Sequence, residues 1–393
     1  MRRRWLAVVW VVALSVWLCG EARAEDAPVQ VYPEVRYTFG EQILFQARFT
    51  PAEAVTRIEV FYRPNWPSGA TLFGDMTLEG DTAFYAHDLK RTPMPPFATV
   101  DYWFRLTLKD GAVETTPIFS FLLEDNRFSW QHVEAAPFRV YWYQGDAAFA
   151  QRIVDAAFAG LHRAQALWLA PVPSHSINIY AYGTAADLQS ALGADGWVAG
   201  HASPQFGAVY VALPPGPQQE AEIRRLVPHE LAHYLLYQQI GDDGYRSLPA
   251  WLNEGLASNT ELTPNPDYDL ALKHAAEAHA LLPLADLCHV FPNDVSGALL
   301  AYAESASFTQ FLLERYGRSA LEALVLTYGQ GVGCEVGVQR VLGAPLGELE
   351  RAWKQTRFQA AATQASLGRL MPWGSILGIL ALSLALGAWI GRR

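Results

Sequence analysis

Cysteine and charge are both scarce in this chain of 393 residues. It has three cysteines and no CxxC pair, so the sequence contains no cysteine-based zinc motif. Charged residues make up 17% of the chain, and no basic stretch occurs outside the two termini. With a net charge of −10, this excludes a nucleic-acid partner, because a phosphate backbone is bound by clustered lysine and arginine. Internal repeats and low-complexity segments are also absent from the sequence.

The N-terminus has the organisation of a secretory signal. Residues 1–24 start with three arginines after Met1, continue with an apolar run from Trp5 to Leu18, and end in small residues suited to cleavage after Ala24. We therefore expect residues 1–24 to be a signal peptide that is removed on export. A retained N-terminal anchor is the alternative, although an apolar run of about 14 residues is short for one.

The C-terminus carries a second apolar segment. Residues 370–390 contain no charged side chain, and Arg392 and Arg393 close the chain. About 21 helical residues at ~1.5 Å each span ~31 Å, which is enough to cross a hydrocarbon core. We expect residues 370–391 to be a transmembrane helix with a basic cytoplasmic tail, so that the protein crosses the cell membrane once and its catalytic domain is extracytoplasmic. A sorting signal that is later removed is the alternative.

Residues 25–127 have the pattern of a β-sandwich. Apolar and polar positions alternate in short runs at 43–49, 57–62 and 102–108, and turn signals separate these runs. About seven such strands predict an all-β immunoglobulin-like or fibronectin-like sandwich. The region contains no cluster of titratable groups suited to catalysis, so we interpret it as a spacer or recognition module. The aromatic segment 125–130 is expected to dock it onto the next domain.

Residues 128–366 predict a second domain of the α+β class. Strand patterns occur at 138–143, 177–182 and 207–212, and an amphipathic helix is expected at 147–169. The remainder is mostly helical, with helices expected at 266–280, 297–316, 318–328 and 346–365.

The most informative motif is HELAH at residues 229–233. On a helix, His229 and His233 lie on one face and can direct two imidazoles at one metal ion. Glu254, in the motif WLNEGLA at 251–257, supplies a carboxylate after a turn into a second helix. Two histidines and one glutamate form a standard ligand set for catalytic zinc, and one position stays open. The sequence therefore predicts one zinc ion per chain, held by His229, His233 and Glu254.

These residue types suit the hydrolysis of peptide bonds. A bound zinc ion lowers the pKa of a water molecule toward ~7 and polarises a carbonyl group. Glu230 lies beside the two histidines in the motif, so we expect it to act as general base on the zinc-activated water and then to pass the proton to the leaving amine. The predicted function is that of a zinc-dependent peptidase with a peptide or protein substrate.

HELAH followed by WLNEGLA resembles the gluzincin metallopeptidases, in particular the peptidase MA-like family. By position, His229, His233 and Glu254 match the family's zinc ligands, and Glu230 matches its general base. The resemblance covers about residues 138–358 and implies a thermolysin-like fold for the second domain. It also implies a tyrosine or histidine from a later helix that stabilises the oxyanion.

Tyr302 is the candidate for that donor, and a packed aromatic residue is the alternative. Two positions depart from the family pattern. Pro228 precedes His229, so the helix is expected to kink or to begin there. Ser258 stands where some gluzincins place an aspartate that orients a zinc-bound histidine, so this support is expected to be weaker. The remaining histidines, including His201, are expected to have no catalytic role.

After export the chain would retain Cys288 and Cys334, and an oxidising compartment would allow them to form a disulfide. Two separate buried thiols are the alternative. Two alternatives to the peptidase also stay open. One is a degenerate gluzincin that binds a peptide or cell-wall partner at the surface without cutting it. The other is a surface protein whose zinc ion only stabilises the fold.

Overall fold

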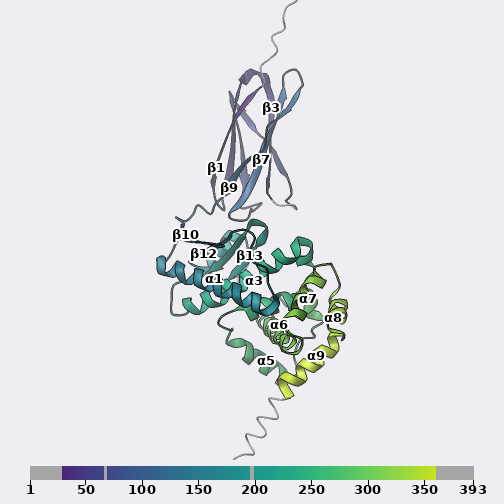
Figure 1. Cartoon of the computed structure of the whole chain (residues 1–393). Coiled ribbons are helices and arrows are strands. Elements are labelled where there is room, and N and C mark those ends of the chain that lie inside the picture. The colour runs from purple at the N-terminus through teal and green to yellow at the C-terminus, as the bar shows by residue number, and fades with distance from the viewer. Residues whose placement is uncertain (1–28, 66–68, 195–198, 360–393) are drawn as a thin grey trace, which may run out of the picture.

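The structure is a computed structural model that describes residues 29–65, 69–194 and 199–359. Residues 30–123 form an N-terminal body of strands, and residues 131–359 form a C-terminal body of strands and helices. The two bodies lie end to end (Figure 1).

The N-terminal body consists of two antiparallel sheets that face each other. Alternation along β2 buries Ile43 and Phe45 between the sheets, and Phe45 contacts the ring of Tyr62 from the opposite sheet. One sheet contains, in spatial order, β1 (Gln30–Thr38), β2 (Gln42–Thr50), β6 (Thr82–Asp88) and β5 (Thr77–Glu79). The other contains β4 (Leu72–Asp75), β3 (Val55–Pro64), β7 (Ala98–Leu108), β8 (Val113–Thr115) and β9 (Phe119–Leu123). Both β8 and β9 pair with β7. A 3-10 turn, η1 (Ala52–Ala54), precedes β3.

The C-terminal body is built on one mixed five-stranded sheet. Its central strands run parallel, and an antiparallel strand pairs with each side. In spatial order the strands are β10 (Gln131–Ala135), β11 (Phe138–Trp142), β12 (Ile177–Tyr182), β14 (Ala208–Ala212) and β13 (Gly200–Ser203). The strand expected at 207–212 is therefore internal, and the short strand β13 forms the edge that follows it in space.

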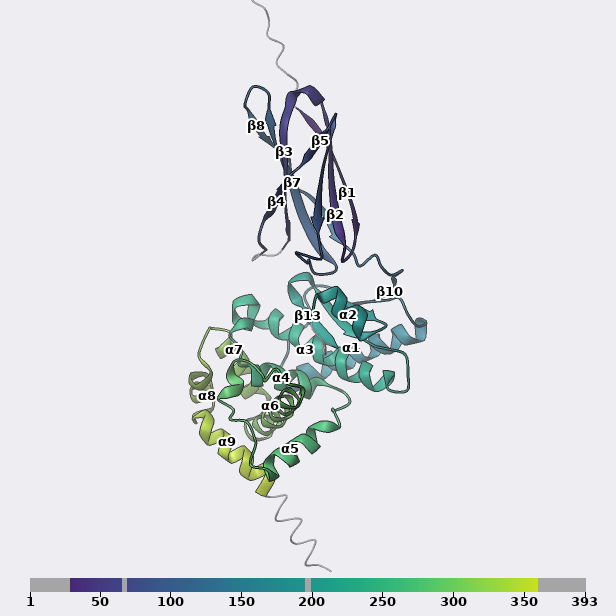
Figure 2. The ribbon, with the colours of Figure 1, turned by 180° about the vertical axis from the view of Figure 1, so that it is seen from behind.

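Long helices cover one face of this sheet. α1 begins where the Asp146 side chain accepts a hydrogen bond from the Phe149 N–H, and it ends at Leu169 in the left-handed conformation. Buried apolar side chains of α1 and α3 pack against Ile179 and Val209 of the sheet. The helices are α1 (Ala147–Trp168), α2 (Ala185–Leu192), α3 (Gln219–Arg246), α4 (Ala250–Thr260), α5 (Asp267–Glu277), α6 (Val295–Tyr316), α7 (Arg318–Tyr328), α8 (Cys334–Leu342) and α9 (Leu346–Lys354), with short turns η2 (Pro204–Phe206), η3 (Asp286–Cys288) and η4 (Gln355–Gln359). Figure 2 shows α5, α6, α8 and α9 at the end of the molecule away from the N-terminal body.

The other face of the sheet packs against the N-terminal body. Tyr141, Tyr180 and Tyr210 stand directly opposite one another on β11, β12 and β14, and their rings stack with centroids 4.7 and 5.5 Å apart. Phe97 of the N-terminal body stacks on Tyr180 at 3.7 Å. The Trp130 ring meets both Phe97 and Tyr180 edge-on. The two bodies thus share a core, and the aromatic segment 125–130 docks them as expected. The domain limits 25–127 and 128–366 stay a prediction.

The fold class expected from the sequence included a C-terminal transmembrane helix, and this prediction was wrong for the described chain. Within residues 29–65, 69–194 and 199–359, no helix is both long and apolar enough to cross a membrane. The predicted segment 370–391 lies outside the described residues, as does the predicted signal peptide 1–24. The architecture that the structure supports is a pair of packed sheets followed by a mixed sheet with helices.

Candidate metal centre

α3 carries both histidines of the HELAH motif. His229 and His233 project from one face of the helix, with ring centroids 5.0 Å apart. The helix begins at Gln219, so it neither begins at Pro228 nor departs from helical backbone angles there; the departure lies at Gly241. Pro228 is buried against α1 instead, where a Cβ on Gly160 would overlap it. The spacing of the two histidines is therefore that of a regular helix.

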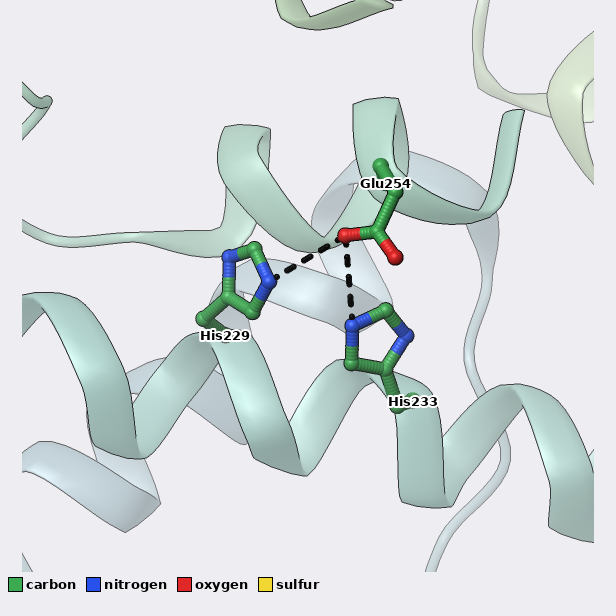
Figure 3. Close-up of side chains that lie close together, drawn as sticks. All are labelled: His229, His233 and Glu254. Atoms are coloured by element: carbon green, nitrogen blue, oxygen red, sulfur yellow. Dashed lines mark ion pairs between the residues drawn. The ribbon is translucent and has the colours of Figure 1, made fainter. Parts of the chain in front are cut away.

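α4 brings Glu254 to the two rings. Its Oε2 lies 3.4 Å from Nε2 of His229 and 3.5 Å from Nε2 of His233, and the three ligand atoms lie within 4.8 Å of one another (Figure 3). These separations are long for hydrogen bonds. The two nitrogen–oxygen separations are close to the ligand spacing of a tetrahedral zinc site, where donors at about 2.0–2.1 Å from the ion lie about 3.3 Å apart. The three residues therefore fit zinc.

Gly255 explains how α4 and α6 approach each other beside this cluster. A Cβ at residue 255 would overlap Thr309 and the carbonyl oxygen of Ser305, both on α6. Only glycine allows this close contact, which brings Tyr302 of α6 near the histidines. Gly255, next to the candidate ligand Glu254, therefore lets α4 lie in close contact with α6.

Each candidate histidine is also held through its second ring nitrogen. Nδ1 of His229 lies 2.9 Å from Oε1 of Glu261, and Nδ1 of His233 lies 3.0 Å from Oδ1 of Asn253. Carboxylate and amide oxygens only accept, so each Nδ1 carries a proton, and in the metal-bound form each Nε2 would present its lone pair to the metal. This tautomer is the one a metal ligand needs.

The electrostatics of the cluster are dominated by burial and by mutual attraction. Burial alone would lower the pKa of His229, but its attraction to the carboxylates of Glu254 and Glu261 outweighs this and raises the pKa to about 10. Burial likewise raises the pKa of Glu254, and the neighbouring imidazoles reverse the shift and lower it. The cluster therefore favours a negative Glu254 facing a positive charge, the arrangement that a bound cation would also satisfy.

Glu230 lies on the same helix and is 7% exposed. Its carboxylate packs under the backbone of Gly200 in β13, where a Cβ would overlap it. Burial raises the pKa of Glu230, and the two histidines partly offset that shift. The structure thus brings Glu230 beside the ligand cluster and against the edge strand, the place that a general base would occupy.

Tyr302 lies beside the cluster. Its ring is 6.3 Å from that of His229 and 5.1 Å from that of Phe291. Burial raises the pKa of Tyr302, and the negative charges of Glu254 and Glu230 raise it further, so the hydroxyl keeps its proton. A protonated hydroxyl next to the ligands can donate a hydrogen bond to a substrate oxygen.

His201 belongs to the tyrosine stack on the opposite face of the sheet. It stands opposite Tyr210 on the edge strand, with ring centroids 6.4 Å apart. His201 therefore ends an aromatic row, and its lack of a catalytic role stays a prediction.

Three residues of the site are not among the sequence candidates. Asn253 orients His233, Tyr245 lies 3.3 Å from the Asn253 amide nitrogen, and Glu261 contacts His229. For Asn253 the signal is its place directly before Glu254. For Tyr245 and Glu261 the sequence contains no signal, since both depend on how the chain returns to α3.

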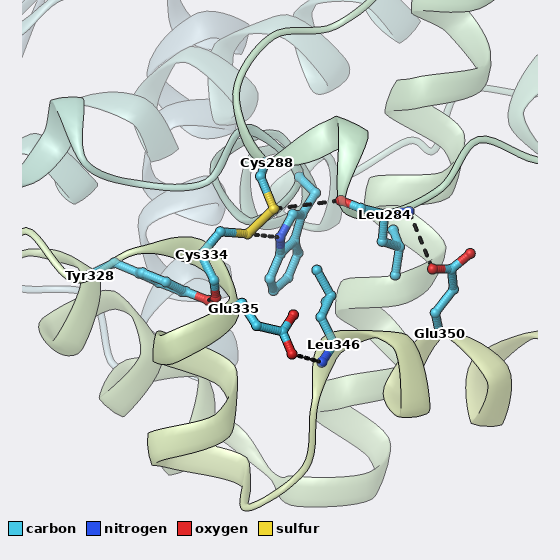
Figure 4. The surroundings of a disulfide bond; sticks show 8 residues. Leu284, Cys288, Tyr328, Cys334, Glu335, Leu346 and Glu350 are labelled. Carbon is cyan, nitrogen blue, oxygen red and sulfur yellow. Dashed lines mark hydrogen bonds between the residues drawn. A yellow bond between two sulfur atoms is a disulfide. The ribbon is translucent and has the colours of Figure 1, made fainter.

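A disulfide joins the turn η3 to the first residue of α8 in the helical region. Cys288 and Cys334 are bonded, as the sequence allowed (Figure 4). The indole N–H of Trp251 donates to Sγ of Cys334 at 3.4 Å. Because Trp251 belongs to α4, the disulfide contacts the helix that carries Glu254.

A profile of the Peptidase MA superfamily matches residues 156–359, just over half of the chain. The chain belongs to the Peptidase MA superfamily. This membership makes the protein a peptidase in general terms, acting on a peptide substrate, and it agrees with the ligand cluster, since the superfamily is generally zinc-dependent. No curated protein matches the sequence of this peptidase.

Two solved structures resemble parts of this peptidase weakly. A bromine derivative of BhCBM56 is 20% identical, with a TM-score of 0.20 over 23% of this chain and 90% of that chain. The purple acid phosphatase PPD1 from yellow lupin (Lupinus luteus) seeds is 10% identical, with a TM-score of 0.21 over 47% of this chain and 35% of that chain.

Proposed function

We propose that the protein is an exported zinc peptidase of the gluzincin type. The observation that carries this proposal is the convergence of Nε2 of His229, Nε2 of His233 and Oε2 of Glu254 within 4.8 Å, with Glu230 next to them. His229, His233 and Glu254 would hold one zinc ion per chain. When bound there, zinc supplies a Lewis acid that acidifies a water molecule and polarises the scissile carbonyl.

Glu230 would act as general base and then as general acid. Its carboxylate is buried between α3 and the Gly200 backbone, and burial raises its pKa, which favours accepting a proton. The same carboxyl group would then give the proton to the leaving amine. Tyr302, whose hydroxyl keeps its proton, would donate a hydrogen bond to the oxyanion.

β13 offers the substrate a place to bind. Among the described residues β13 pairs with β14 alone and is an edge strand, and its Gly200 lies directly over Glu230. An extended peptide can add to such an edge through backbone hydrogen bonds, which give affinity with little dependence on sequence. This placement would bring a scissile bond close to Glu230.

The disulfide supports export. Cytosolic reductants keep thiols reduced, whereas Cys288 and Cys334 are bonded here. The proposed removal of residues 1–24 agrees with that location.

The test measures cleavage of a quenched mixed-peptide library by the purified protein. It is run with zinc, after treatment with a chelator, and with the Glu230→Gln variant. The proposal expects cleavage that the chelator abolishes and added zinc restores, and that E230Q lacks although it still binds zinc. Bound zinc without cleavage of peptides or unfolded proteins would instead favour the degenerate, binding-only protein. Absence of zinc binding would contradict the metal centre itself.

A further inference from the structure

His229 is held by a carboxylate that comes from an unexpected place in the sequence. Nδ1 of His229 lies 2.9 Å from Oε1 of Glu261, seven positions after Glu254, whereas Ser258 occupies the fourth position. Glu261 directly follows α4, with extended backbone angles (φ −54°, ψ 133°) that turn the chain toward α3. The first residue beyond the helix thus reaches back to a candidate ligand.

Burial makes this contact costly unless a positive charge is near. Glu261 is 1% exposed, and among the described residues its ion pairs include neither lysine nor arginine, only His229. Its other oxygen, Oε2, is buried and lacks a hydrogen-bond partner among the described residues. A buried carboxylate is destabilising without a compensating charge. A cation bound at Nε2 of the same ring would compensate it through the imidazole.

The backbone beside Glu261 is anchored by a carbonyl that Pro228 leaves available. The N–H of Leu262 donates to the carbonyl oxygen of Arg224 at 2.9 Å. In a regular helix the residue four positions later would donate to that oxygen, but here this residue is Pro228, which has no N–H. The proline before His229 thus leaves an acceptor for the residue after Glu261.

We propose that Glu261 is the positioning residue of His229, and that Pro228 secures it through the Arg224 carbonyl. The inference rests on the proposed zinc site. Glu261 fixes the ring so that its Nε2 faces Glu254, and the negative charge makes His229 a stronger donor toward a metal. At the corresponding nitrogen, Nδ1, His233 contacts the neutral amide of Asn253 and not a carboxylate.

The test measures zinc affinity by competition with a chromophoric chelator, which is a readout independent of catalysis. Glu261→Gln retains an acceptor oxygen and removes the charge, and we expect zinc to bind about 10–100-fold more weakly, still at one ion per chain. The matched control is Glu304→Gln, another fully buried glutamate, on α6 and away from the cluster. This control should stay within about twofold of wild type, since Glu304 does not contact a ligand.

A second variant keeps the inference testable if E261Q folds poorly. Pro228→Ala restores an N–H that competes with Leu262 for the Arg224 carbonyl, which loosens the backbone beside an unchanged Glu261, so zinc affinity should again fall. His229→Ala removes a proposed ligand, so a loss of zinc binding by this variant shows that zinc binds at this site. If H229A abolishes binding but E261Q and P228A bind zinc like wild type, the positioning role is overturned and the zinc site stands. The same holds if both variants only lower the melting temperature of the metal-free protein. Absence of zinc binding by wild type would overturn the proposed function first.

Discussion

The indole N–H of Trp251 donates to Sγ of Cys334, which joins the helix of Glu254 to the disulfide. Replacement of both Cys288 and Cys334 by serine removes a crosslink between residues 46 positions apart. We expect the free energy of unfolding to fall by about 2–4 kcal/mol, because the unfolded chain gains conformational freedom. Denaturant titration measures this loss. Equal stability of the variant and the oxidised wild type would contradict the prediction.

Gly200 is expected to control the position of Glu230. Gly200→Ala places a Cβ where the Glu230 carboxylate lies, so that carboxylate must move. Peptide cleavage should fall by about 10²–10⁴-fold, the usual contribution of a general base, while zinc affinity stays near that of wild type. Gly333→Ala is the control, since a Cβ there meets no atom within 4 Å. Full activity of G200A would show that Glu230 does not depend on this contact.

Tyr302→Phe removes the proposed oxyanion donor and keeps the ring. We expect kcat to fall by about 10²–10³-fold with little change in KM, because the hydrogen bond acts on the transition state. Tyr316→Phe, on the same helix, serves as the matched control. Turnover of Y302F close to wild type would make Tyr302 a packing residue only, which is the alternative that the sequence left open.

The raised pKa of Glu304 predicts that the free energy of unfolding depends on pH. Burial raises its pKa from 4.5 to about 7, although the Leu282 N–H and Lys354 partly oppose the shift. Below pH 4.5 this carboxyl is neutral in both folded and unfolded states, so it costs nothing. Between about pH 4.5 and pH 7 the unfolded state ionises while the folded state keeps its proton, so stability falls by up to about 3 kcal/mol, and above pH 7 the loss is constant.

Glu304→Gln removes this titration. As the pH is raised from 4.5 to 8, wild type should therefore lose stability relative to E304Q. Parallel denaturant titrations across that interval measure it. A difference that does not vary with pH would contradict the raised pKa.

Much of the candidate site could be predicted because its information is local. The spacing of His229 and His233 becomes one helical face wherever the chain is helical, and Glu254 needs only a turn and a second helix to return. Local periodicity also predicted α7, which spans the expected residues 318–328. Composition left two possibilities for Cys288 and Cys334, a disulfide or two separate thiols, and the structure shows the disulfide.

What could not be predicted depends on contacts between distant segments. Glu261 reaches His229 only because the chain turns at the end of α4 and bonds to α3. The edge strand β13 has four residues, too few for a periodic pattern, so the sequence did not predict it. Short helices such as α8 were missed for the same reason. The transmembrane helix was predicted from a long apolar run and two terminal arginines, and the segment 370–391 lies outside the described residues.

The stacked tyrosines lie against the N-terminal body, so separating the two bodies would expose them. The fully or nearly buried rings of Tyr180 and Tyr210 would face water if the chain were cut at residue 128, and Phe97 would lose its stacking partner. A fragment that retains only the C-terminal body would therefore aggregate through this bare aromatic surface rather than remain a minimal enzyme. The two bodies should melt in a single cooperative transition, as one folding unit.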